Sequence, residues 1–229
     1  MLQTKLKGSG PNDNIEGQID PSYQALRTSQ RPLEFTDSSG NPGGHYYLTA
    51  ISGTIAASLG ANSVLFSIRW TDAAKRFILL GLRAGLGVYT AGQTVANPLE
   101  LEAVIARGFT VDFTTNATTI TPANGTQRAR GDMMSNSFLS TNSGVKICTT
   151  TGMTGMTYTL DTAGFGFCTY PGNALGVADT KDLYIIDPLR HPIVLAQNEG
   201  IIIRNSGAFG AAATFKLGVT VIWAEAPQY

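Results

Sequence analysis

The 229 residues are enough to form one large β domain, and their composition excludes several classes of function. Charged residues make up 14% of the chain, against roughly 25% in a typical soluble domain. The 16 Lys and Arg balance the 16 Asp and Glu, so a net charge of zero gives no basis for binding nucleic acid or an acidic membrane. So few charges indicate either a surface rich in Thr and Ser or, as we expect, a subunit that sits between neighbours.

The first 44 residues lack apolar periodicity and are rich in Gly, Pro, Asn, Gln and Ser. Four prolines recur along them, and each favours extended backbone at the residue before it. We therefore expect an extended N-terminal arm over residues 1–44 that docks on a neighbouring surface. The residues expected to make this interaction are four apolar and two basic ones, Tyr23, Leu26, Arg27, Arg31, Leu33 and Phe35. The start of the chain has no apolar core of a signal peptide, which predicts synthesis and retention in a cytoplasm.

A β pattern follows the turn signal at residues 41–44. Apolar alternation or a short apolar run predicts strands at 47–53, 64–70, 77–82 and 109–113. Residues 99–107 are the best helix candidate because they are rich in Leu, Glu and Ala. The same nine residues also alternate between apolar and acidic side chains at their start, so a strand stays open as the alternative.

Residues 114–143 are dominated by Thr, Asn, Ser, Gly and Arg and are interpreted as one long polar excursion, with short strands near Ile120 and Phe138. Excursions of this length in a compact domain usually have a function or contact a partner. Further strands are predicted at 158–160, 165–167 and 183–186. Residues 193–195 and 201–203 flank a turn signal at 198–200, which predicts a β-hairpin.

The last predicted strand, residues 214–223, has the clearest pattern in the chain. Its odd-numbered residues form one apolar face, Phe215, Leu217, Val219, Val221 and Trp223. Short strands with turn signals every ten residues or so predict an all-β fold, an antiparallel β-sandwich of the jelly-roll or immunoglobulin-like kind. We expect residues 45–229 to form this single domain.

No set of residues with catalytic spacing is present. His45 and His191 belong to no metal-binding pattern, and residues 81–87 are Gly-rich without the strand-to-helix context of a phosphate loop. Glu100 with Glu102, and Asp179 with Asp182, could be imagined as acid–base pairs, but solvated carboxylates explain them more simply. Cys148 and Cys168 are expected to be buried free thiols, although one disulfide between them is possible. We therefore expect no enzyme activity, no cofactor and no metal.

Three segments together carry a resemblance, residues 66–72 (FSIRWTD), 193–205 (IVLAQNEGIIIRN) and 217–225 (LGVTVIWAE). With them, the chain resembles a group of poorly characterised β-sandwich virion structural proteins of tailed bacteriophages. The resemblance covers roughly residues 46–113 and 183–226. It implies a structural part of a virus particle, assembled in the host cytoplasm, and brings no catalytic residues with it.

The function expected from these features is that of a capsid decoration (cement) protein that stabilises the head. Its partners would be the major capsid protein or other virion proteins, and copies of itself, with a homotrimer favoured. One alternative is a receptor- or glycan-binding head-fibre or tail component, in which loop aromatics such as Tyr170 and Phe138 would stack on sugars. The other is a jelly-roll shell protein.

Overall fold

The structure, a computed structural model, describes residues 5–7, 14–16, 18–20, 25–27, 35–36, 42–43, 45–90, 98–120, 127–129, 139, 144–170, 178–187, 191–210 and 214–226. The chain divides into two units, residues 1–34 and 35–229. Among the described residues, there is no helix with the length and apolar character needed to cross a membrane.

Short antiparallel strand pairs occupy the described part of residues 1–44, where we expected an extended arm. In the first unit, β1 (Lys5–Lys7) pairs with β2 (Asn14–Glu16), and β3 (Gln18–Asp20) pairs with β4 (Ala25–Arg27). The second unit begins with another such pair, β5 (Phe35–Thr36) and β6 (Pro42–Gly43).

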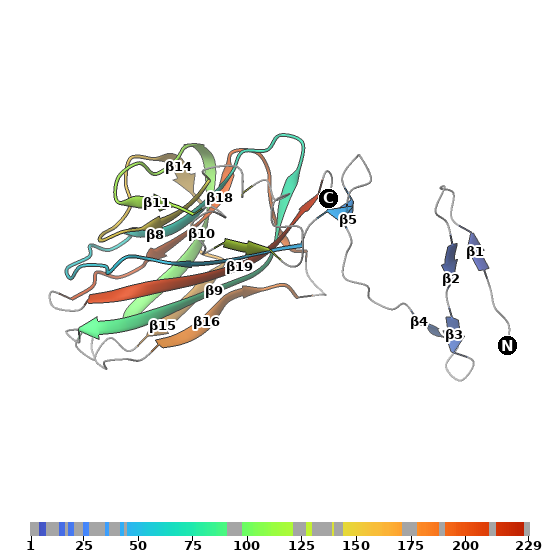
Figure 1. The fold of residues 1–229 in the computed structure, drawn as a ribbon, viewed down its shortest axis with the longest axis horizontal. Helices are drawn as coiled ribbons and strands as arrows, with labels where there is room; N and C mark the ends of the chain where they lie inside the picture. The colour runs from blue at the N-terminus through green and yellow to red at the C-terminus, as the bar shows by residue number, and fades with distance from the viewer. Residues whose placement is uncertain are drawn as a thin grey trace. The chain divides into compact units, whose positions relative to one another are not determined.

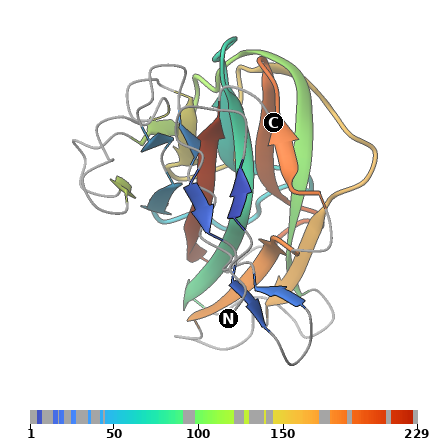
Figure 2. The same ribbon diagram turned by 90° about the vertical axis from the view of Figure 1, so that its right-hand side faces the viewer.

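The second unit is an antiparallel β-sandwich, which confirms the predicted fold class (Figures 1 and 2). We call one sheet the β19 sheet after its central strand. It has the order β12 (Gln127–Ala129), β7 (His45–Ile51), β19 (Thr214–Ala226), β9 (Arg76–Thr90) and β16 (Ala178–Ile185), and β17 (Ile193–Leu195) also pairs with β9.

The other sheet, which we call the β18 sheet, contains seven strands. Its order is β11 (Ala117–Thr119), β13 (Val145–Cys148), β8 (Val64–Trp70), β18 (Glu199–Asn205), β10 (Leu99–Val111) and β14 (Thr157–Leu160), and β15 (Gly166–Tyr170) also pairs with β10. Two strands from the predicted polar excursion, β11 and β12, therefore belong to opposite sheets.

The core lies between the sheets and includes the apolar face predicted for the closing strand. All five of its odd-numbered residues from Phe215 to Trp223 are at most 1% exposed. The ring of Trp223 lies 5.4 Å from that of Tyr46 and stacks on Phe77 at 6.0 Å. Phe77 in turn contacts Trp70 of the β18 sheet at 5.8 Å. This aromatic cluster joins the two sheets through dispersion and area burial.

The helix expected at residues 99–107 is wrong, because these residues form the first part of β10. Leu99, Leu101 and Ala103 are fully buried, while Glu100 and Glu102 lie half-buried on the opposite face. The strand, which the alternating apolar and acidic residues also indicated, is thus the correct assignment. Helix propensity is a weak preference, and β10 pairs with strands on both sides, so tertiary context overrides it.

The hairpin expected at residues 193–203 is also wrong. β17 pairs with β9 in the β19 sheet, whereas β18 pairs with β8 and β10 in the β18 sheet. The turn between them, with Asn198 at a φ of 62°, therefore carries the chain from one sheet to the other. Two apolar strands beside a turn are compatible with both arrangements, since each buries its apolar face in the same core.

The end of β10 departs from simple alternation. The pairing of β10 with β14 shifts register between Arg107 and Val111, and Gly108 has a φ of 58°. Phe109 and Phe113 are buried, but Val111 between them is 45% exposed. The single apolar face expected for residues 109–113 is therefore interrupted by a β-bulge.

Candidate functional site

The two thiols lack the features of a reactive centre. Cys148 and Cys168 are free and buried. Burial raises the pKa of the Cys148 thiol to about 12 and raises that of Cys168 as well. His191 is exposed ahead of β17, and the side chain of His45 lies outside the described residues. Within the described ranges, no three His, Cys, Asp or Glu side chains are grouped so that they could hold a metal ion.

The acidic residues considered as acid–base pairs have structural partners instead. Glu102 accepts a 2.9 Å hydrogen bond from Arg204 Nε, and Glu100 accepts one of 2.6 Å from the Ser206 hydroxyl. Asp182 pairs with Arg83 at 2.5 Å. The side chain of Asp179 lies outside the described residues. Residues 81–87, the Gly-rich stretch, lie within β9 and so form part of a strand rather than a phosphate loop.

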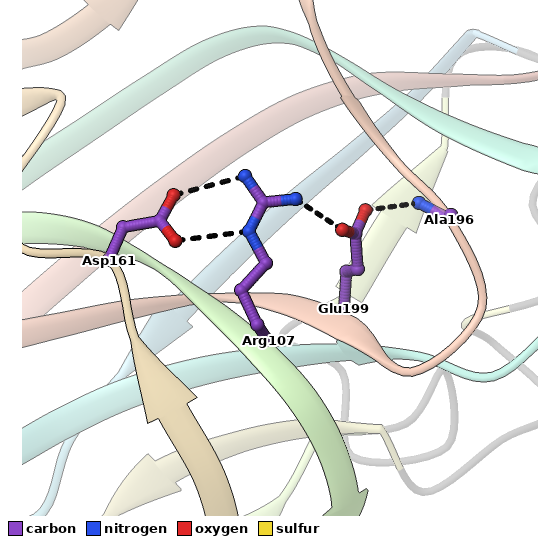
Figure 3. Close-up of polar contacts among 4 residues, drawn as sticks. All are labelled: Arg107, Asp161, Ala196 and Glu199. Carbon is purple, nitrogen blue, oxygen red and sulfur yellow. Dashed lines mark hydrogen bonds and ion pairs between the residues drawn. The ribbon is translucent and has the colours of Figure 1, made fainter.

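Arg107 holds a network that joins three segments of the β18 sheet (Figure 3). Its Nε and Nη2 each donate a 3.0 Å hydrogen bond to Asp161, which follows β14, and its Nη1 donates to Glu199 at the start of β18. Glu199 also accepts a 2.7 Å hydrogen bond from the backbone N–H of Ala196.

These bonds stabilise charged forms of both partners. Hydrogen bonds from Arg107 lower the pKa of Asp161, and hydrogen bonds to Asp161 raise the pKa of Arg107. Both carboxylates are paired with Arg107, and Glu199 also caps the turn at Ala196. The network therefore holds strand ends together and leaves neither carboxylate free to act as an acid or base.

Half of the six predicted interaction residues lie outside the part of the chain that the structure describes. Tyr23, Arg31 and Leu33 fall outside the described residues. Leu26 and Arg27 lie on β4, opposite Ile19 and Gln18, and Phe35 lies on β5 opposite Gly43. The arrangement of their side chains is not described, so their proposed role stays a prediction.

One of the two loop aromatics expected to stack on sugars is buried. Tyr170 is 2% exposed and donates a 2.5 Å hydrogen bond to the carbonyl oxygen of Ala84. It therefore belongs to the core and cannot stack on a sugar. Phe138 falls outside the described residues.

The candidate site that remains is a broad surface, the outer face of β7, β19, β9 and β16, which we call the glycine face. Residues directly opposite one another on neighbouring strands share a face. The registers define four rows across this face: Tyr47, Ile222, Gly81 and Ile185; Thr49, Thr220, Arg83 and Asp182; Ile51, Gly218, Gly85 and Thr180; and Lys216, Gly87 and Ala178.

Few charges and several small residues characterise the glycine face. Arg83 and Asp182 form an ion pair within it, with side chains 52% and 42% exposed. Ile51 and Ile185, at opposite edges, are 60% and 55% exposed. Between them, the central strands carry three glycines of β9 and one of β19. Lys216 adds a third charge in the fourth row. A face with so few charges is suited to contact with another protein surface.

The glycine face was missed in the sequence, although part of its signal was present. Gly81, Gly85 and Gly87 are separated by even numbers of residues, which places them on one face of any strand. Their pairing with Gly218 depends on the position of β19 beside β9, which the local sequence does not contain.

Comparison with known proteins adds no family. No protein-family model and no curated protein matches the chain.

Proposed function

We propose that this protein is a non-enzymatic virion structural protein, and specifically a capsid decoration protein that stabilises the head of a tailed bacteriophage. It acts by covering and bridging subunits of the shell. Its partners are the major capsid protein and further copies of itself. The virion role rests on the resemblance of three segments, which lie on β8, on β17 with β18, and on β19.

The strand order is the observation that carries this proposal. The eight longest described strands of the second unit, lettered B to I in chain order, are β7, β8, β9, β10, β15, β16, β18 and β19. The β19 sheet contains them in the order B-I-D-G, and the β18 sheet in the order C-H-E-F. This order is that of a jelly roll, an architecture common among capsid and lectin domains. Because fold alone does not define function, the order supports the virion class without excluding a lectin.

The distribution of charge supports a role in assembly over one in catalysis. Five carboxylates pair with arginines of the same chain, namely Asp112, Asp161, Asp182, Glu102 and Glu199. Because these carboxylates are paired within the chain, the charge-poor subunit has few carboxylates that could act as acids or bases. A subunit of this kind is stabilised by burial against neighbours in a symmetric lattice.

Copy number in purified particles tests the proposal. Quantitative mass spectrometry of particles from the encoding phage should find hundreds of copies, whereas a dozen or so would indicate a tail component. Particles that lack the protein should lose resistance to heat and osmotic shock. Full resistance in such particles would contradict the decoration role, and specific binding on a glycan array would favour the receptor-binding alternative.

The N-terminal segment offers a second test of the same proposal. We propose that residues 1–34 attach the sandwich to the shell. A chain that begins at Phe35 keeps β5 and β6 with the second unit. It should fold cooperatively, with the far-ultraviolet circular dichroism of a β-sheet protein, but no longer bind particles that lack the protein. If it bound them as well as the full chain does, the attachment role of this segment would be wrong.

A further inference from the structure

A small apolar cluster lies at one end of the β19 sheet, separate from the main core. We call it the end cluster, and it consists of Ile78, Ala224 and Ala226, with half-buried Leu80 and Val194 packed against them. Ala224 and Ala226 alternate along β19 with Trp223, whose side chain is in the core, so they project from the opposite face. Ile78 lies opposite Ala224, and Val194 lies opposite Ile78. The end cluster is therefore on the outer face of the sheet.

The end cluster is hidden from solvent although it lies on an outer face. Ala224 is 0% exposed, and Ile78 and Ala226 are each 1% exposed. Ile51 and Ile185, elsewhere on the outer face, are 60% and 55% exposed. Ala226 is the last residue of β19, where a sheet has fewer neighbouring side chains to cover it. An alanine at such a place is buried when another segment packs over it.

The pair formed by β5 and β6 is the segment placed to cover the end cluster. β6 ends at Gly43, two residues before His45, and His45 lies opposite Ala224. Two residues of extended chain span at most about 7 Å, so β6 lies close to the end of β19. Pairing of Phe35 with Gly43 holds β5 at the same place, and both strands contact β19. They form a sheet of their own rather than extending the β19 sheet, as a pair packed on a face does.

Docking stabilises both sides of this contact. An isolated two-stranded hairpin is at best marginally stable in water, and β5 and β6 contain only two residues each. Packing on an apolar surface supplies the burial that such a pair lacks by itself, and it removes the end cluster from water. Ala224 and Ala226 suit the contact because short side chains let another backbone approach the sheet closely.

We infer that β5 and β6 form a clasp that docks on the end cluster, over Ala224 and Ala226. Because the clasp directly follows residues 1–34, it fixes the point at which that segment leaves the sandwich. A force on the segment is then transmitted to the central strand of the β19 sheet rather than to a flexible linker. The inference concerns a contact within the chain, so it goes beyond the proposed function and does not depend on it.

Hydrogen–deuterium exchange of the full-length protein, measured by mass spectrometry, tests the inference. The reference is a synthetic peptide of residues 35–44, which has no sandwich to dock on. In the wild-type protein, the amides of residues 35–44 should exchange at least about tenfold more slowly than in the peptide, because a docked segment must open before it exchanges. Equal exchange rates in the protein and the peptide would overturn the inference.

Ala226→Glu shows whether the end cluster holds the segment. The substitution places a charge in the cluster, opposite Arg76 on β9, with which the new carboxylate can pair. Exchange of residues 35–44 should rise to within about twofold of the peptide rate, while β19 and β9 stay protected. Ala226→Gln, which adds the same bulk without the charge, takes its place if β19 itself loses protection.

Ile51→Glu is the matched control, because it places the same charge on a residue of the outer face that is 60% exposed and outside the end cluster. It should leave the exchange of residues 35–44 as slow as in the wild type. Slow exchange that persists in both Ala226 variants would show that the segment is held elsewhere, and would overturn the inference. A protein with a docked clasp that is missing from particles would contradict the proposed function alone.

Discussion

The hydroxyl of Tyr170 donates a 2.5 Å hydrogen bond to the carbonyl oxygen of Ala84, and so links β15 of one sheet to β9 of the other. Both residues are buried. The Nζ of Lys181 lies 5.2 Å from the centre of the Tyr170 ring. A polar bond between two sheets, inside a largely apolar core, fixes their relative position as well as contributing to stability.

Removing this hydroxyl should destabilise the fold without affecting any surface. We expect Tyr170→Phe to lower the free energy of unfolding by about 0.5–1.5 kcal/mol, the usual net worth of a buried hydrogen bond. Urea denaturation measures the change. Tyr47→Phe is the control, because the bond that the Tyr47 hydroxyl accepts among the described residues is a local one, from Thr49 on the same strand. Equal stability of the two variants would show that the link between the sheets contributes nothing.

Alanine substitution at two glycines should have opposite effects, although both lie on central strands. A Cβ at Gly200 would lie 2.3 Å from the carbonyl oxygen of Ile68 and 2.6 Å from Phe109 Cδ1. Gly200→Ala must therefore displace backbone, and we expect a loss of about 2–4 kcal/mol. A Cβ at Gly218 would meet only Gly85 O, at an ordinary contact distance of 3.9 Å. Gly218→Ala should therefore be neutral or stabilise by up to about 1 kcal/mol.

Thermal and urea unfolding at low protein concentration, where copies do not associate, provides the comparison between these two variants. A destabilised Gly218→Ala would mean that the glycine is needed within the subunit. That result would explain one glycine of the glycine face without any contact to another protein.

The bond between Arg107 and Asp161 should make stability depend on pH in the acid range. The folded state lowers the pKa of Asp161, so its contribution is present above the unfolded pKa of about 3.9 and is lost as the pH falls through the lower, folded value. Asp161→Asn removes that contribution at every pH. Because the pair is exposed, the variant should lose no more than about 1 kcal/mol near neutrality.

The difference in unfolding free energy between wild type and Asp161→Asn should therefore shrink as the pH falls from about 5 toward 2. Urea titrations at several pH values measure it. A difference that stayed constant over this range would contradict the role assigned to the Asp161 carboxylate.

The two thiols should not react in the folded protein. Thiolate is the reactive form, and burial raises the pKa of Cys148 to about 12 and raises that of Cys168. Ellman's reagent at about pH 8 should label neither cysteine in the native state and both after denaturation. Rapid labelling of either cysteine before unfolding would show that its surroundings open to solvent.

Local sequence patterns correctly predicted the strands that have one face in the core and the other face outside it. β19 alternates residue by residue, so its buried face was predicted correctly. β10 was harder, because Leu, Glu and Ala favour a helix in isolation. In the fold, Glu102 is satisfied by Arg204 and Glu100 by Ser206, both held at the far end of β18 or just beyond it. These partners are distant in the chain, so only tertiary structure identifies the strand.

The arrangement of sheets and the candidate surface depend on the same long-range information. The apolar segments at 193–195 and 201–203 were predicted as strands, but no local signal assigns them to different sheets. Likewise, the pairing of Gly85 with Gly218 exists only because β19 inserts between β7 and β9. The residues of a surface can therefore be individually visible in a sequence while the surface itself is not.

That insertion also determines when the protein can fold during its synthesis. Only β19 joins β7 to β9, and only β18 joins β8 to β10, although β8, β9 and β10 have earlier partners in β13, β16 and β15. A partial chain that lacks β18 and β19 therefore cannot complete either sheet, and it leaves apolar strand edges unpaired. Folding dominated by such distant pairings is slow, and strands that remain unpaired are prone to aggregate. A nascent chain that stops before residue 214 is therefore expected to become a substrate for chaperones and proteases rather than a smaller sandwich.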